Sequence, residues 1–136
     1  MKRVLYLMAL VFFTLALAGR GGEKISGSDI EIGPSDDYTE AEITAAMDIV
    51  QEHFENTFEG CTLTALRYDE DEVGDMEAEW AEQYDADQAI VLLSDFETDQ
   101  RGGDGSLNPN DTYANWQWIL VRTDGGEWSL KTMGYG

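Results

Sequence analysis

The chain has 136 residues, of which 28 are acidic and 8 are basic, so its formal net charge is −20. This length accommodates one domain. So acidic a chain lacks the clustered basic side chains that nucleic-acid phosphates and anionic lipid headgroups require. One cysteine and one histidine exclude a disulfide framework and a zinc site of the Cys/His type. We therefore expect a small acidic domain with no nucleic-acid partner, and we assign it no metal and no cofactor.

Residues 1–18 have the three parts of a secretory signal. Met1-Lys2-Arg3 is basic, residues 4–18 form an apolar run, and Ala16-Leu17-Ala18 fits a cleavage site. The run is shorter than the roughly 20 apolar residues of a spanning helix. We therefore expect processing, a secreted or extracellular protein, and no stable membrane span afterwards.

The end of the signal also matches a bacterial lipoprotein box over Leu17-Ala18-Gly19. Arg20 occupies the position of the lipid-bearing cysteine, so we expect no lipid anchor. Residues 19–37 are rich in Gly, Ser and Asp and predict a flexible spacer, which leaves residues 38–136 as a single domain. Removal of residues 1–18 takes two basic side chains and no acid, so six basic and 28 acidic side chains remain, a net charge of −22.

The domain begins with a predicted helix over residues 39–58. Thr39 and Glu42 fit a capping box, and Gly60 is placed to end the helix. One face carries apolar residues at helical spacing; these are Ile43, Met47, Val50, Phe54 and Phe58.

A strand and a short helix are predicted next. Residues 61–68 are rich in Thr and aliphatic side chains and favour a strand, whose imperfect alternation indicates a bulge. Residues 69–72 are interpreted as an acidic turn. Met76, Trp80 and Tyr84, spaced four residues apart, predict a short helix over residues 76–84.

Three strands complete the prediction. Residues 89–93 are a continuous apolar run, typical of a central strand, which we expect to end near Phe96. A polar loop follows over residues 97–111, and loops of this length are usually functional or mobile. Strands near 112–122 and 127–133 flank Thr123-Asp124-Gly125-Gly126, a hairpin signal. The order predicts an α+β domain, a long N-terminal helix packed on a four-stranded antiparallel sheet with a short second helix between strands 1 and 2.

The hairpin allows two registers. With Asp124-Gly125 as the turn, Arg122 faces Glu127 and Val121 faces Trp128; with Gly125-Gly126 as the turn, two acidic side chains face each other. Opposite charges favour the first register. Its helix-facing side carries Ile119, Val121, Trp128 and Leu130, and its other side carries Trp116 and Trp118.

The sequence resembles an uncharacterised family of small exported bacterial proteins. The resemblance covers roughly residues 38–136. It is carried by the Gly60-Cys61 step, by residues 87–92, by Gly103 to Asn110, by Trp116-Gln117-Trp118 with Trp128-x-Leu130, and by Gly134-Tyr135-Gly136. It implies a cystatin-like, ketosteroid-isomerase-like α+β cone and an association with the cell envelope of Gram-positive gut bacteria. The family offers no catalytic residue to carry over, and Arg20 departs from an anchored member.

Candidate contact residues are chosen from aromatic and acidic side chains. Trp116 and Trp118 point the same way, because alternate residues of a strand share a face. They either line an internal pocket or second core layer, or form a patch for self-association or a partner. The candidates for ligand or partner contact are Trp116, Trp118, Tyr68, Tyr113 and Asp95.

The remaining acidic loops and reactive side chains are predicted to have structural roles. Residues 69–75 begin like a calcium loop but fail at Val73 and at Trp80, where the closing glutamate belongs. Residues 104–111 offer oxygens at alternate positions without such a glutamate, so solvated acidic turns are predicted at both places. His53 is expected at the margin of the helix's apolar stripe, and Cys61 as a buried inert thiol.

Two function classes follow. The first is an exported, non-catalytic binding or protein-interaction domain, with a homodimer or protein partner possible through the sheet face. The alternative is a small-molecule enzyme or binder that uses the cone between helix and sheet, with Asp95 or Asp87 as base and Tyr68, Tyr84 or Tyr113 as donor. With 28 acids in the chain, no residue is assigned as catalytic. An enclosed pocket with a raised-pKa carboxylate favours the second class, and a filled cone with exposed tryptophans the first.

Overall fold

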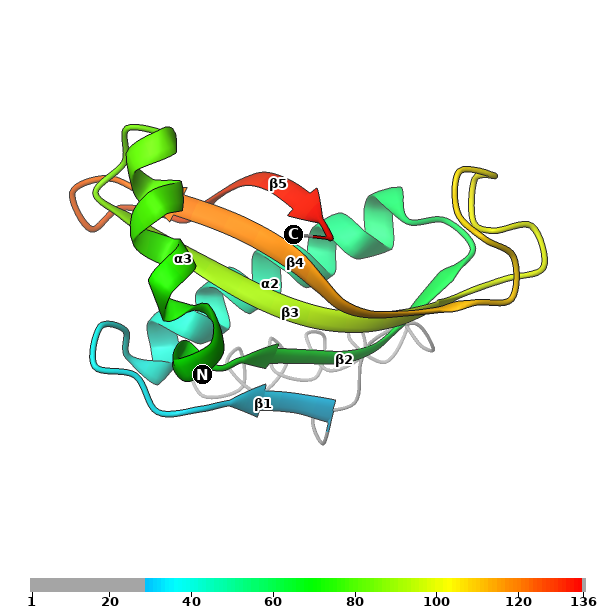
Figure 1. Ribbon diagram of the computed structural model, residues 1–136, viewed down its shortest axis with the longest axis horizontal. Coiled ribbons are helices and arrows are strands. Elements are labelled where there is room, and N and C mark those ends of the chain that lie inside the picture. Colours follow the sequence, from blue (N-terminus) through cyan, green and yellow to red (C-terminus); the bar gives the residue numbers. More distant parts are fainter. Residues whose placement is uncertain (1–28, 136) are drawn as a thin grey trace, which may run out of the picture.

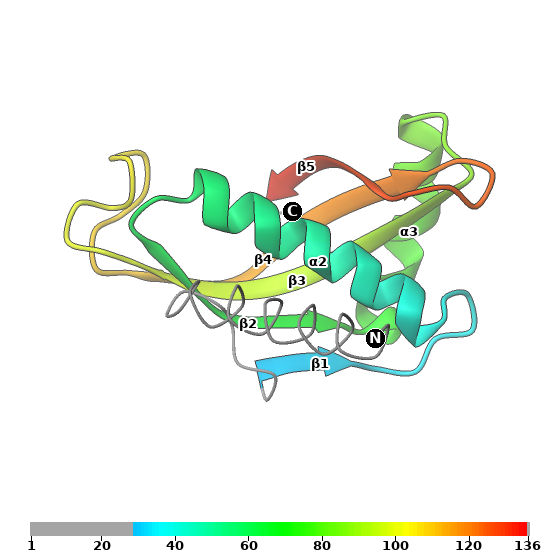
Figure 2. The same ribbon diagram turned by 180° about the vertical axis from the view of Figure 1, so that it is seen from behind.

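The computed structural model describes residues 29–135. The predicted signal and lipoprotein box fall on residues 1–20, outside the described residues. The elements in chain order are β1 (Ile30–Ile32), α2 (Glu40–Thr57), β2 (Cys61–Tyr68), α3 (Glu70–Gln83), β3 (Gln88–Thr98), β4 (Thr112–Arg122) and β5 (Ser129–Gly134) (Figure 1). They form an α+β fold in which α2 and α3 lie on opposite faces of one sheet, as the two opposed views show (Figure 2).

The sheet has five strands in the order β1-β2-β3-β4-β5, and β1 pairs with β2 in parallel while the other pairs are antiparallel. The prediction of a four-stranded antiparallel sheet is therefore wrong. The missed strand lies within the predicted spacer of residues 19–37. Ile30 pairs with Leu66 and Ile32 with Tyr68, so this three-residue strand depends on contacts distant in sequence. A parallel pair needs a crossover connection, and α2 supplies it.

Helix α2 confirms the predicted helix. Thr39 is its N-cap, and both hydrogen bonds of the capping box with Glu42 are present. The helix buries one apolar face consisting of Ile43, Ala46, Met47, Val50 and Phe54. Strand β2 also agrees with its prediction, including a register irregularity between Leu63 and Ala65.

Helix α3 starts six residues before the predicted position. Asp69 is its N-cap and accepts a hydrogen bond from the backbone N–H of Asp71, at 3.1 Å. The acidic residues interpreted as a turn form the first helical turn, where negative side chains stabilise the positive end of the helix dipole. The calcium-like segment of residues 69–75 is thus the start of a helix.

The hairpin forms the predicted Asp124-Gly125 turn, but the strand register differs. Asp124 and Gly125 both have positive φ, and Gly126 N–H donates to Thr123 O at 3.0 Å. Val121 nevertheless pairs with Ser129, not Trp128. A shift by one residue reverses which side chains face which layer. Trp128 is drawn to α2, where its Nε1 donates to the backbone oxygen of Glu42 at 3.0 Å.

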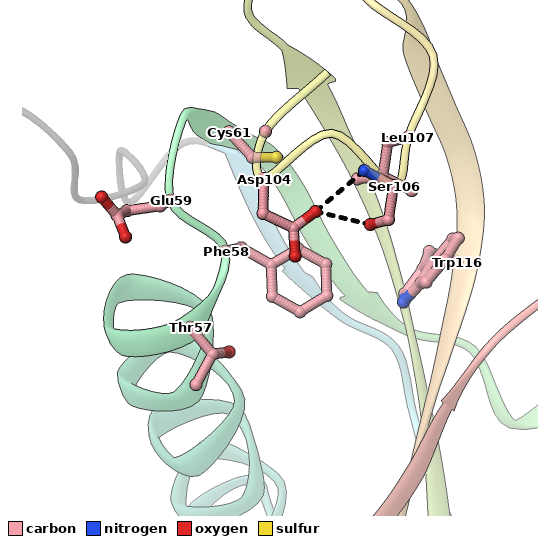
Figure 3. A pocket seen from close by; sticks show the side chains of 9 residues that line it. Thr57, Phe58, Glu59, Cys61, Asp104, Ser106, Leu107 and Trp116 are labelled. Carbon is pink, nitrogen blue, oxygen red and sulfur yellow. Dashed lines mark hydrogen bonds between the residues drawn. The ribbon is translucent and has the colours of Figure 1, made fainter. Parts of the chain in front are cut away.

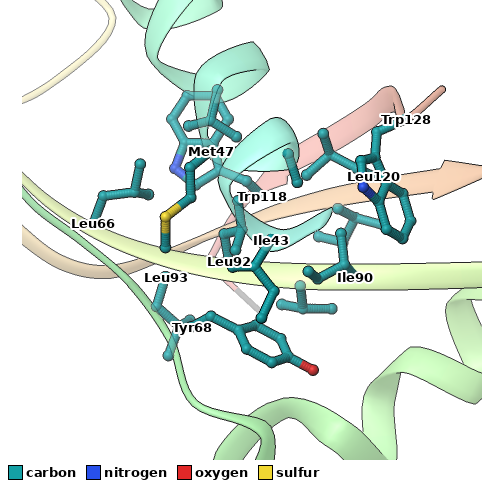
Figure 4. Packing of buried hydrophobic residues seen from close by; sticks show 14 of the residues in the cluster. Ile43, Met47, Leu66, Tyr68, Ile90, Leu92, Leu93, Trp118, Leu120 and Trp128 are labelled. Carbon is teal, nitrogen blue, oxygen red and sulfur yellow. The ribbon is translucent and has the colours of Figure 1, made fainter. Parts of the chain in front are cut away.

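The core fills the space between α2 and the sheet (Figure 4). Trp118, Leu92 and Ile90 are completely buried there, against the apolar stripe of α2. A smaller cluster of Ala81, Ala89 and Val121 lies under α3 on the other face of the sheet. No helix within residues 29–135 is long and apolar enough to cross a membrane.

Candidate functional site

Trp118 and Trp116 lie on the face of β4 that α2 covers. Trp118 has no exposed surface, and its Nε1 donates to Ser94 Oγ at 2.8 Å. Its ring packs against Phe54 and Phe58, with centroids 6.4 and 5.5 Å away. Trp118 is therefore a core residue. The expectation that both indoles lie on the sheet face away from the helix is wrong: they share the helix-covered face with Trp128, which the shifted register of β5 brings there.

Trp116 is half-buried at the edge of this core, near the C-terminal end of α2. Its ring meets Phe96, Tyr113 and Tyr135, with centroids 5.3, 5.7 and 5.1 Å away. The indole Nε1 is buried and has no hydrogen-bond partner within residues 29–135. A buried donor without an acceptor costs about 1–3 kcal/mol, so this N–H is the clearest unmet polar group of the fold.

A pocket of about 200 Å³ opens beside this indole. We call it the Trp116 pocket. It is lined by Thr57, Phe58, Glu59, Cys61, Gly103, Asp104, Ser106, Leu107 and Trp116. Four parts of the fold build it: the end of α2, the start of β2, the loop between β3 and β4, and β4. Figure 3 shows the nitrogen of Trp116 turned toward the side of the pocket where Phe58 and α2 lie.

The loop that forms one wall is held by its own backbone. The Asp99 carboxylate accepts from the N–H groups of Arg101 and Gly103, at 2.9 and 3.0 Å, and these donors lower the pKa of Asp99. Gly102 has φ of +70°, and a Cβ there would lie 2.1 Å from Leu107 O. Only glycine fits this close approach, so the wall is preformed.

The ionisable side chains of the pocket include an ionised carboxylate, Asp104, and a protonated thiol, Cys61. Asp104 Oδ1 accepts from the hydroxyl and backbone N–H of Ser106, at 2.6 and 3.0 Å. These bonds lower the pKa of Asp104, which keeps it ionised at neutral pH. Burial, aided by the Asp99 and Asp104 carboxylates, raises the pKa of the Cys61 thiol. The thiol therefore stays protonated, which makes it a poor nucleophile.

Two features extend the pocket outward. A second hollow lined by Glu59, Gly60, Arg101, Gly103, Asp104 and Gly105 shares three residues with it. On the other side, Tyr113 and Tyr135 stack at 5.8 Å beside Trp116. Tyr135 is 58% exposed, so an aromatic surface continues from the pocket to solvent.

Of the five predicted contact residues, Tyr113 and Trp116 lie side by side. The other three lie elsewhere. Asp95 faces the sheet side opposite α2, where its Oδ1 accepts from Arg67 Nη2 at 3.2 Å and from Asn115 N–H at 3.0 Å. Tyr68 is buried near the start of α2. Of these candidates only Trp116 lines the pocket. Tyr113 contacts the Trp116 ring from outside the lining, and Asp95 and Tyr68 have structural partners of their own.

Glu77 is a buried carboxylate that the sequence reading missed. It is 6% exposed, and it accepts from Val91 N–H at 3.0 Å and from Tyr68 Oη at 3.1 Å. Burial is the main cause that raises the pKa of Glu77 to about 7. The same burial and the Glu77 charge raise the pKa of Tyr68. The spacing of four residues could have indicated its burial, because Val73, Glu77 and Ala81 share one face of a helix that starts at Glu70.

Other candidate groups have structural roles. Asp87 Oδ2 accepts from Asp124 N–H at 2.7 Å, and Tyr84 stacks on Trp80 at 6.1 Å. His53 is half-buried beside Trp118, with ring centroids 6.0 Å apart. Within residues 29–135, no group of three or more His, Cys, Asp or Glu side chains is placed to hold a metal ion.

Comparison with known proteins gives no identification. No family model, curated protein or solved structure matches this chain. The resemblance to an exported cystatin-like family therefore stays a prediction, and functional inference depends on the geometry of the Trp116 pocket.

Proposed function

We propose that this chain is an exported, non-catalytic binding domain that takes a group of another molecule into the Trp116 pocket. The observation that carries the proposal is the buried, unpartnered Nε1 of Trp116 in the wall of that pocket. Buried polar groups in native proteins nearly always have a partner. The nitrogen itself is closed to solvent, so an oxygen acceptor of a ligand seated between Trp116 and Phe58 would reach it once the indole turns into the pocket.

The surroundings support binding more than catalysis. The pocket pairs apolar and aromatic walls with a few polar groups, which is typical of ligand sites. Burial and the nearby carboxylates hold its thiol protonated, and no hydrogen bond joins that thiol to a base among the lining residues. The raised-pKa carboxylate, Glu77, lies outside this pocket, and both of its oxygens are engaged.

The alternative of an enzyme working between helix and sheet has less support. Trp118, Leu92 and Ile90 fill that space, so a substrate has no room there. A protein partner or second copy that meets the sheet through Trp118 has the same difficulty, because that indole has no exposed surface.

The proposal is tested by following the indole N–H signals in ¹H–¹⁵N spectra. N-methylacetamide offers a carbonyl acceptor and glucose offers hydroxyl acceptors. We expect at least one of them to shift the Trp116 signal. The Trp118 and Trp128 signals should not shift, because both N–H groups already have hydrogen-bond partners.

Substitution of Trp116 by Phe keeps an aromatic ring and removes the donor. Followed by the backbone amide signals of Gly103 and Ser106, this variant should fold and lose the binding, whereas Trp80→Phe, on α3, leaves binding unchanged. If neither these two probes nor the peptides described below move the Trp116 signal, the pocket is not a binding site.

A further inference from the structure

We propose that the Trp116 pocket recognises an arginine side chain, and a neighbouring peptide carbonyl, of a protein partner. This inference rests on the proposed function and names its ligand class. Three residues that line the pocket carry it: Asp104 with its ionised carboxylate, Phe58 with its ring, and Trp116 with its ring and its unpartnered N–H.

The carboxylate is Asp104. Ser106 occupies its Oδ1 with two hydrogen bonds, and no group within residues 29–135 donates to its Oδ2. Figure 3 shows this second oxygen pointing toward the ring of Phe58. A guanidinium that donates to Oδ2 would therefore lie against the Phe58 ring. Charge-assisted hydrogen bonds of this kind are shorter and stronger than neutral ones.

The aromatic rings complete a site of suitable chemistry. Guanidinium groups stack on aromatic faces and are attracted by the ring quadrupole. The same chain already uses this arrangement internally: Arg122 lies 4.4 Å from the Trp128 ring centroid and 5.7 Å from that of Tyr38, and donates to Glu42 at 2.5 Å. Phe58, Trp116 and Asp104 offer the same combination to an arginine from outside.

The donor and the net charge specify how the arginine is presented. Trp116 Nε1 needs an acceptor, which a guanidinium lacks and a peptide carbonyl supplies. A net charge of −20 raises the local concentration of cationic partners and speeds their association. Arg101 in the adjoining hollow opposes a cation there, so the guanidinium should enter on the side of Phe58 and Trp116.

The test compares two peptides that differ only in charge. Acetyl-Gly-Arg-Gly-amide and its neutral citrulline counterpart are titrated into the chain, and the Trp116 indole signal gives each affinity. We expect the arginine peptide to bind about tenfold or more tightly than the citrulline peptide. Raising the salt concentration should weaken only the arginine peptide.

A matched pair of variants locates the interaction. Asp104→Asn keeps the Oδ1 that accepts from Ser106 and removes the charge, so the loop should fold as before. Asp104 is exposed, so we expect a loss of about three- to fivefold in affinity for the arginine peptide. Asp124→Asn makes the same charge change at the exposed hairpin turn and should leave the affinity within about twofold.

The outcomes separate this inference from the proposed function. Equal affinity for both peptides, or no effect of Asp104→Asn, overturns the arginine inference and leaves a neutral ligand in the same pocket. A shift with N-methylacetamide or glucose but with neither peptide has the same meaning. If none of the four probes shifts the Trp116 signal, both proposals are overturned.

Discussion

Two indoles on one strand, two residues apart, have opposite roles because of one hydroxyl. Trp118 Nε1 has Ser94 Oγ as its acceptor, and both residues are completely buried. Trp116 Nε1 has no acceptor within residues 29–135. The first indole is therefore fixed in the core, and the second retains an unused donor that a ligand can take.

This difference predicts two stability effects. Ser94→Ala leaves the Trp118 N–H unpaired in the core and should lower the free energy of unfolding by about 1–3 kcal/mol. Trp118→Phe also removes that bond and leaves a cavity, so it should cost more than Trp116→Phe, which removes no hydrogen bond. Urea unfolding of the three variants measures these effects. A larger loss for Trp116→Phe than for Trp118→Phe would contradict the assignment of core and pocket.

Glu77 makes stability depend on pH. Its pKa of about 7 lies above the ordinary value of 4.5, because burial penalises the charged form. Folding therefore favours the protonated group. The stability that it contributes is full below about pH 4.5 and is lost as the pH rises through about 7. The shift corresponds to a loss of about 3 kcal/mol between these limits.

The Glu77→Gln variant tests this sign. It stays neutral, so we expect it to be more stable than the wild type above pH 7, with a flatter profile between pH 5 and 8. Urea unfolding across that range measures the difference. Glu79→Gln, at an exposed position of the same helix, is the matched control and should follow the wild-type profile. A wild-type stability that increases over this range would refute the role of Glu77.

At the scale of elements, two side chains hydrogen-bond to the β3 backbone beyond the point where β2 ends. Strand β3 extends beyond Tyr68 on that side, leaving backbone groups without a neighbouring strand. Glu77 from α3 accepts from Val91 N–H, and Tyr38 Oη donates to Ala89 O at 2.5 Å. The two helix-associated side chains thus take the place of strand residues, which explains why a carboxylate is buried at this position.

The capping box at the start of α2 makes its own contribution to the free energy of unfolding. Thr39→Ala removes the capping box and should lower the free energy of unfolding by about 0.5–2 kcal/mol. Thr44→Ala, exposed within the same helix, removes no cap and introduces a better helix former, so its stability should stay or rise. Thermal or urea unfolding compares the pair. Equal losses in both variants would show that the cap is not the cause.

Local signals predicted most elements, and they failed where distant partners decide. The capping box and apolar spacing gave α2, and the positive-φ pair Asp124-Gly125 formed the expected turn. Strand β1 could not be predicted, because Ile30 and Ile32 are ordered by β2, over thirty residues away in the chain. The Trp116 pocket has the same origin, since its lining comes from four separate parts of the fold.

At the scale of the whole molecule, repulsion among carboxylates opposes folding. The chain carries 28 acidic and 8 basic side chains, and only two ion pairs form within residues 29–135, Arg67 with Asp95 and Arg122 with Glu42. Salt screens the repulsion. We expect the unfolding temperature to rise when sodium chloride is raised from low to physiological concentration, as measured by circular dichroism. A lower unfolding temperature in salt would mean that attractive pairs dominate.

The sequence alone determined the acidity, the α+β composition and the position of α2, because these depend on composition and on contacts within a few residues. Tertiary structure decided the rest. Trp116 and Trp118 on β4 face α2, and the shifted register of β5 brings Trp128 onto the same face, where its Nε1 donates to the backbone oxygen of Glu42. Burial of one indole and partial exposure of the other followed from that packing. A pairing shift of one residue changes no local propensity, yet it reverses which face each side chain occupies.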